Sequence, residues 1–140
     1  MSHRDYSHRD VVDKLGVRPG HAVAFAEEGG QIEASLCQRV LARAGRPPAE
    51  AGEPLDVALV AVDRDADLVR VLGRWKNCIR PAGSIWLLTP KRSQPGYVGE
   101  QVLIAAGQKA GLVDNKVCSV SDTTSAIRFV IRRAERPTAV

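Results

Sequence analysis

The stretch that most constrains the fold is an unbroken run of six apolar residues, 57–62, with Asp56 before it and Asp63 after it. A strand with one face in water alternates apolar and polar residues. A continuous run rich in β-branched residues is instead typical of a strand buried on both faces. The run therefore predicts the central strand of a parallel sheet, whose strands must be joined by crossover helices.

Further apolar patterns predict three strand–helix units followed by a hairpin. Strands are predicted at residues 21–26, 57–62, 84–88, 116–120 and 126–132. Helices are predicted at residues 31–44, from a cap at Asp63 or Asp65 to a stop at Pro81, and at 97–110. The last two strands flank so short a turn that they must pair antiparallel. We expect an α/β, Rossmann-like sandwich of two or three layers, with three parallel strands and a C-terminal antiparallel hairpin in one sheet.

A length of 140 residues predicts one domain over 1–140, with a core built mainly from Val, Leu, Ile and Ala. Residues 1–16 are predicted to be a helical segment that Ser7 caps and Gly16 ends. Residues 133–140 are predicted to be a flexible tail. The chain shows neither a signal peptide nor a membrane-length apolar stretch, and its three cysteines fit buried positions in a reducing, cytoplasmic compartment.

The connections between the parallel strands predict where the helices lie. If the three parallel strands are neighbours in chain order and every crossover is right-handed, all the crossover helices fall on one face of the sheet. The N-terminal helix is too short to cover the other face alone. We therefore expect an apolar groove there, or a homodimer formed through that face.

The charge of the chain limits its partners. Lys and Arg exceed Asp and Glu by 20 to 16, a formal charge of +4. This mild excess permits an anionic ligand. The positive charges are scattered rather than gathered in a stripe with stacking aromatics, so we expect no nucleic-acid binding.

Several segments resemble a bacterial family of uncharacterised proteins of about this length. The segments that carry the resemblance are 14–20, 81–86, 90–91, 110–118 and 122–130. More remotely, a hairpin that ends a parallel sheet resembles class I S-adenosylmethionine-dependent methyltransferases. The resemblance implies a shortened version of that fold that keeps the first strand and the last four. It also implies S-adenosylmethionine as the cofactor to consider.

Ligands of open α/β sheets bind outside the carboxyl ends of the strands, where three loops are expected to meet. In the first loop, Gly29 and Gly30 would let the backbone approach a cofactor, and Glu27 would hold one of its polar groups. The resemblance places this loop where methyltransferases have their glycine loop. The alternative is a turn with a solvated pair of acids.

The other two loops supply the remaining candidates for a ligand-binding crevice. Asp63 could accept hydrogen bonds from a ribose or an adenine amine, or it could cap the helix that follows. Lys91 and Arg92 could clamp a phosphate or a carboxylate, or they could form a solvated basic loop.

Two functions are consistent with these residues. The first is a non-catalytic module that binds a small anionic or nucleoside-type ligand, or a partner. It is favoured by the missing strand units, by the incomplete glycine loop and by the lack of a paired nucleophile and base. The alternative is a minimal S-adenosylmethionine-dependent methyltransferase. We expect no catalytic residue and no metal site.

Overall fold

The structure is a computed structural model that describes residues 10–136. Its strands are β1 (Val23–Glu28), β2 (Leu55–Val62), β3 (Ile79–Pro90), β4 (Leu112–Ser119) and β5 (Thr124–Ile131). Its helices are α1 (Val11–Lys14), α2 (Ala34–Ala44), α3 (Leu68–Lys76), α4 (Glu100–Lys109) and the short 3-10 helix η2 (Arg133–Glu135). None of the helices in this part of the chain has the length and hydropathy of a membrane span.

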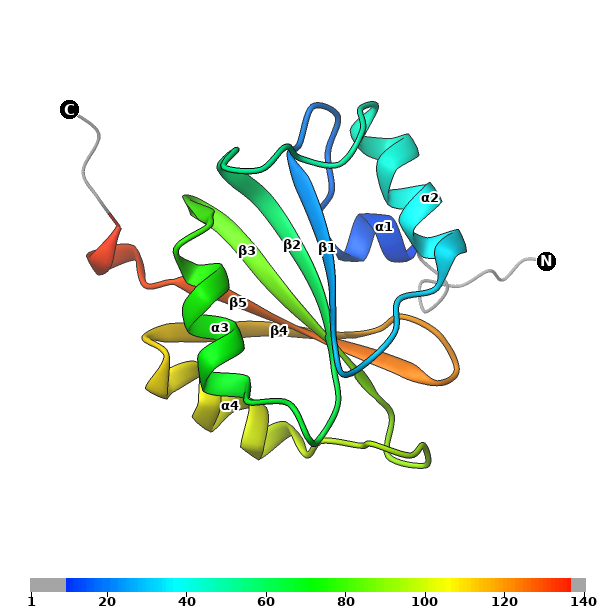
Figure 1. The fold of residues 1–140 in the computed structure, drawn as a ribbon, viewed down its shortest axis with the longest axis vertical. Helices are drawn as coiled ribbons and strands as arrows, with labels where there is room; N and C mark the ends of the chain where they lie inside the picture. The colour runs from blue at the N-terminus through cyan, green and yellow to red at the C-terminus, as the bar shows by residue number, and fades with distance from the viewer. Residues whose placement is uncertain (1–9, 137–140) are drawn as a thin grey trace.

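The five strands form one sheet in the order β1-β2-β3-β5-β4 (Figure 1). β1, β2 and β3 are parallel, whereas β5 lies between β3 and β4 and is antiparallel to both. The α/β fold class, the three parallel strands and the antiparallel hairpin are therefore confirmed.

The apolar run at 57–62 forms most of β2, and every residue of the run is at most 2% exposed. β2 lies in the middle of the three parallel strands, between β1 and β3. Its side chains alternate between two separate hydrophobic clusters, with Ala58, Val60 and Val62 in one and Val57, Leu59 and Ala61 in the other. Both faces of the strand are thus covered, as the unbroken apolar pattern predicts.

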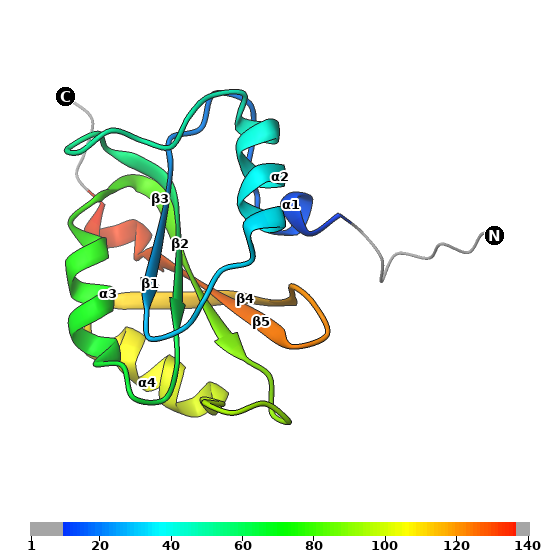
Figure 2. The same cartoon turned by 45° about the vertical axis from the view of Figure 1, so that its right-hand side comes forward.

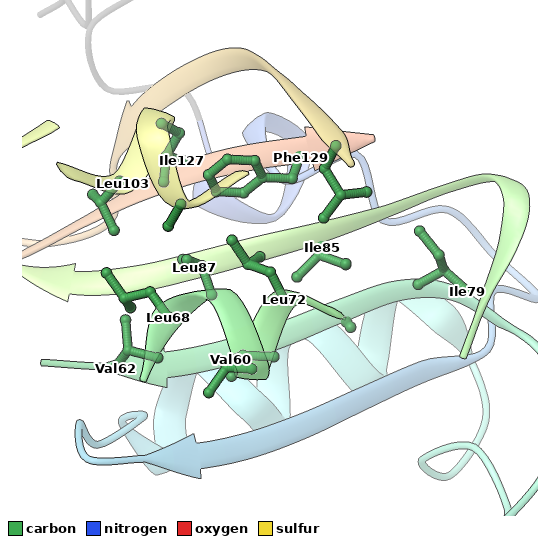
Figure 3. Close-up of a cluster of buried hydrophobic side chains, with 14 of the residues drawn as sticks. Val60, Val62, Leu68, Leu72, Ile79, Ile85, Leu87, Leu103, Ile127 and Phe129 are labelled. Carbon is green, nitrogen blue, oxygen red and sulfur yellow. The ribbon is translucent and has the colours of Figure 1, made fainter. Parts of the chain in front are cut away.

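The helices lie on both faces of the sheet, so the prediction of a single helical face is wrong (Figure 2). Leu68 and Leu72 of α3 and Leu103 of α4 belong to the same hydrophobic cluster as Val60, on one face of the sheet (Figure 3). α1 and α2 pack with Leu59 on the other face. Since β1, β2 and β3 are parallel neighbours in chain order, the crossovers through α2 and α3 have opposite hands. The prediction assumed that both were right-handed, which is the strong general rule. The homodimer was predicted because one face of the sheet was expected to be uncovered. α1 and α2 cover that face, so the homodimer remains a prediction that has lost this reason.

The helix between β2 and β3, α3, is shorter at both ends than the pattern predicts. α3 begins after Asp67, whose carboxylate accepts a hydrogen bond from the Arg70 backbone N–H at 3.2 Å. Neither Asp63 nor Asp65 caps it. The helix ends at Lys76, and Pro81 lies inside β3. The pairing of β3 with β2 shifts register between Ile79 and Ser84, and Pro81 lies in this irregular segment. Proline has no backbone N–H to donate to the neighbouring strand, so such a segment tolerates it.

The two ends of the described chain also differ from prediction. The N-cap of α1 is Asp10, which accepts a hydrogen bond from the Val12 N–H at 2.9 Å, while Ser7 lies outside the described residues. Beyond α1, the Leu15 carbonyl accepts a hydrogen bond from the Trp86 indole at 3.0 Å. In the predicted tail, residues 133–135 form η2, and residues 137–140 lie outside the description.

Candidate functional site

The candidate residues that follow β1 and β2 meet at the carboxyl ends of these strands. Gly29 forms an isolated antiparallel bridge with Val62, and the Gly30 N–H donates to the Ala61 carbonyl at 3.4 Å. Gly29 has a φ of 109°, and a Cβ atom built on it would lie 2.8 Å from the Asp63 Oδ1 atom. A Cβ atom on Gly30 would lie 2.9 Å from the Val62 carbonyl oxygen. The glycine pair is therefore folded back onto the end of β2.

A third glycine lies against Asp63 from the loop that follows β3. A Cβ atom on Gly96 would lie 3.1 Å from the Asp63 Cβ atom, and the Gly96 carbonyl accepts a hydrogen bond from the Arg64 N–H at 3.1 Å. The Asp63 Oδ1 atom accepts a hydrogen bond from the Asp65 N–H at 3.0 Å. Asp63, which is half-buried, is thus contacted by both neighbouring loops. The sequence marked 89–96 as a loop but gave no signal that Gly96 would contact Asp63.

The two adjacent glutamates belong to β1 rather than to a loop, which corrects the prediction for 27–30. The Glu27 Oε2 atom accepts a hydrogen bond from the Ile32 N–H at 2.8 Å. Glu28 forms an ion pair with Arg74 of α3. Neighbouring residues of a strand point to opposite faces, so the carboxylates of Glu27 and Glu28 do not share a site. Each one has a separate partner.

Lys91 and Arg92 lie apart from the Gly29–Asp63 contact. The Lys91 ammonium donates to the Ser119 hydroxyl at 2.7 Å, and the Arg92 guanidinium lies over the Tyr97 ring at 5.9 Å from its centroid. Both line a cavity of about 240 Å³ whose walls include Tyr97 and Leu103 and do not include Asp63. The six candidate residues therefore do not line one common crevice.

A separate groove of about 340 Å³ opens at the same end of the sheet. It lies between the segment that leads into α2, the end of β3 with its following loop, and the β4–β5 turn. Its walls are Gln31, Ile32, Glu33, Pro90, Gln94, Pro95, Thr123 and Thr124. These walls offer amide and hydroxyl groups for hydrogen bonds but hold no cation, histidine or cysteine. The predicted loop at 89–96 placed Pro90, Gln94 and Pro95 at this sheet edge. Residues 31–33 were predicted to belong to a helix, but α2 begins only at Ala34.

The remaining reactive side chains do not assemble into a catalytic group. The one histidine among residues 10–136 is His21, which precedes β1 at the amino end of the sheet. No group of three or more His, Cys, Asp or Glu side chains in this part of the chain could hold a metal ion. Burial raises the pKa of the Cys37 thiol, and the nearby charge of Glu27 raises it further. A thiol in that state is a poor nucleophile.

The family model described as "Protein of unknown function (DUF3052)" matches residues 12–133. The chain belongs to this family. The resemblance to a family of uncharacterised proteins is thereby confirmed, and it covers most of the DUF3052 chain. No curated protein matches the sequence.

Solved structures similar to this DUF3052 protein include several methyltransferases. The mitomycin 7-O-methyltransferase MmcR aligns with a TM-score of 0.58 and 17% identity over 86% of this chain and 52% of that chain. A SAM-dependent O-methyltransferase from Thermotoga maritima aligns with a TM-score of 0.61 and 9% identity over 90% and 65%. A SAM-dependent methyltransferase from Aquifex aeolicus aligns with a TM-score of 0.56 and 11% identity over 86% and 88%.

These alignments show a methyltransferase-like fold, and at such low identity they show the fold alone. The chain spans about half the length of the mitomycin enzyme, with 52% of that chain aligned.

Proposed function

We propose that this DUF3052 protein is a non-catalytic binding module that uses a shortened methyltransferase-like fold. It would take a small ligand or a partner without transferring a methyl group. The observation that carries the proposal is the contact of Gly29 with Asp63, which occupies the place where the resemblance implies a cofactor.

The residues at this place do not fit S-adenosylmethionine in the way that the resemblance implies. A cofactor loop must keep backbone N–H groups free to point at the ligand. Here the Gly30 N–H donates to β2, and Gly29 is bridged to Val62. The carboxylates of Glu27 and Asp63 already accept hydrogen bonds from backbone N–H groups of their own chain.

The chemistry at this end of the sheet also favours binding over catalysis. Methyl transfer to an oxygen or nitrogen acceptor is commonly assisted by a base within hydrogen-bond reach of the acceptor's proton. Glu33 is the one titratable side chain in the groove beside α2, and His21 lies at the opposite end of the strands. The groove therefore offers one carboxylate and no histidine to act as such a base, which supports binding rather than catalysis.

Calorimetric titration with S-adenosylmethionine and with its demethylated product tests the proposal. We expect neither heat nor a thermal shift at millimolar ligand. Binding at micromolar concentration, with methyl transfer to any acceptor, would support the minimal methyltransferase instead. In that case Glu27→Ala should weaken binding and Glu135→Ala, a change in the distant η2, should not.

A further inference from the structure

Two cations face each other on the neighbouring strands β4 and β5, near the β4 edge of the sheet. Lys116 of β4 is paired in register with Arg128 of β5, and Arg128 is paired with Trp86 of β3. Paired residues point to the same face, so both cations lie on the face that α1 and α2 cover. Like charges directly opposite each other destabilise a sheet unless an anion lies between them.

No carboxylate among residues 10–136 forms an ion pair with either cation. The Arg128 guanidinium donates to the Asn115 side-chain oxygen at 3.3 Å, and the Lys116 ammonium donates to the Lys14 carbonyl at 3.1 Å. Burial lowers the pKa of the half-buried Arg128, and the charge of Arg136 lowers it further.

Both cations line a polar cavity of about 310 Å³ at the amino ends of the parallel strands. Its polar walls include Lys14, Arg18, His21, Ser84, Lys116 and Arg128. Ser84 is 3% exposed and is one of the residues that line the cavity. The His21 Nδ1 atom accepts a hydrogen bond from the Arg18 N–H at 3.1 Å, which leaves Nε2 as the donor of the neutral ring.

Two acids also line the cavity, but each already has a cation of its own. Asp13 pairs with Arg43 at 2.6 Å, and Asp56 pairs with Arg80 at 3.3 Å. The four cations Lys14, Arg18, Lys116 and Arg128 therefore have no carboxylate partner among the described residues. Such an excess of charge inside a concave site concentrates anions.

We propose that this cavity binds the phosphate group of a small molecule. Four cations and the donors of Ser84 and His21 exceed what one carboxylate can use, whereas a phosphate dianion offers more acceptor oxygens and more charge. The volume leaves room for an organic group attached to the phosphate. The site lies at the opposite end of the strands from Asp63, so it is independent of the function proposed above.

Thermal unfolding in inorganic phosphate, with chloride at equal ionic strength as the reference, tests the site. We expect phosphate, at concentrations too low for its general kosmotropic effect, to raise the unfolding temperature and chloride not to do so, because an anion that binds the native state stabilises it. Lys116→Gln and Arg128→Gln should each weaken phosphate binding at least tenfold. Lys109→Gln, which removes an exposed cation at the end of α4, should leave it unchanged. Equal effects of phosphate and chloride, or equal losses in all three variants, would overturn the proposal.

Two further readouts separate the site from a structural role of these cations. Without phosphate, Lys116→Gln should be at least as stable as the wild type, because it removes the repulsion from Arg128. A variant that is less stable and yet keeps the full response to phosphate would contradict the assignment. Amide chemical shifts of residues 114–118 and 128 should move with phosphate, and those of Gly29 and Asp63 should not. Acetate that binds as tightly as phosphate would overturn the choice of phosphate over carboxylate.

Discussion

Gly29 lies so close to Asp63 that a Cβ atom at position 29 would stand 2.8 Å from the Asp63 Oδ1 atom. This contact joins the carboxyl ends of β1 and β2, and Gly96 closes on the same aspartate from the loop after β3. The space beside Asp63, at the end of the sheet that binds cofactors in larger α/β proteins, is thus occupied by the chain's own loops.

Gly29→Ala should destabilise the protein for two reasons that add. Its φ of 109° is costly for any residue with a side chain, by roughly 1–3 kcal/mol, and the new Cβ would also collide with Asp63. Urea denaturation measures the loss. Gly52→Ala is the matched control, because Gly52 has a φ of 84° and nothing within 4 Å of its Cβ position. Equal losses in the two variants would mean that the Asp63 contact contributes nothing.

Gly107 of α4 packs against the Phe129 ring so closely that an added Cβ would overlap the ring. Gly107→Ala should therefore cost roughly 1–3 kcal/mol through overpacking, despite the better helix propensity of alanine. Gly73 of α3 has no atom within 4 Å of its Cβ position, so Gly73→Ala should stabilise the protein by roughly 0.5–1 kcal/mol. Thermal unfolding of both variants gives the comparison. A stabilising Gly107→Ala would contradict the packing of α4 on β5.

The carboxylate of Asp10 should make stability depend on pH. The hydrogen bond from the Val12 N–H and the charges of Arg39 and Arg43 lower the pKa of this group. Because the pKa is lower in the folded than in the unfolded chain, the stabilisation is complete above the unfolded value and is lost as pH falls through the folded one. The stability difference between the wild type and Asp10→Asn should therefore shrink below about pH 4. Urea denaturation at a series of pH values measures it, and a difference that persists in strong acid would refute the assignment.

The three cysteines should react at different rates with a thiol reagent. Cys78 is exposed, whereas Cys37 and Cys118 are partly buried, and burial raises the pKa of both of these thiols. A raised pKa lowers the fraction of reactive thiolate. Labelling of the native protein should show one fast and two slow phases, and Cys78→Ser should remove the fast one. In denaturant all three should react alike. The sequence-based expectation of three buried cysteines is wrong for Cys78.

Local pattern predicted the secondary structure well where one physical signal dominated. The run in β2 has no polar residue that could face water, and the short turn between β4 and β5 leaves no room for a crossover. The start of α3 was harder, because Asp63, Asp65 and Asp67 are all competent caps. The conformation of the loop makes Asp67 the N-cap of α3. In the same loop Asp63 accepts the hydrogen bond from the Asp65 N–H instead of capping the helix.

The candidate site was predicted less well than the fold. Gly29, Gly30 and Asp63 do meet, since residues at the carboxyl ends of neighbouring parallel strands must lie close together. Whether such residues leave a crevice or fill it depends on loop conformations that no short-range pattern encodes. The separation of Lys91 and Arg92 from Asp63 follows from contacts with Ser119 and Tyr97. Ser119 in particular is 28 residues distant from Lys91 in the chain.

The sequence by itself determined the parallel β2, the hairpin and the order of the elements, because these depend on local periodicity and on loop length. The tertiary structure alone decided that α2 and α3 cover opposite faces, that Gly29 and Gly96 both approach Asp63, and that Lys116 faces Arg128. Each of these depends on the hand of a crossover or on the register between distant strands. Those are properties of how segments pack in space, and the residues within any one segment do not fix them.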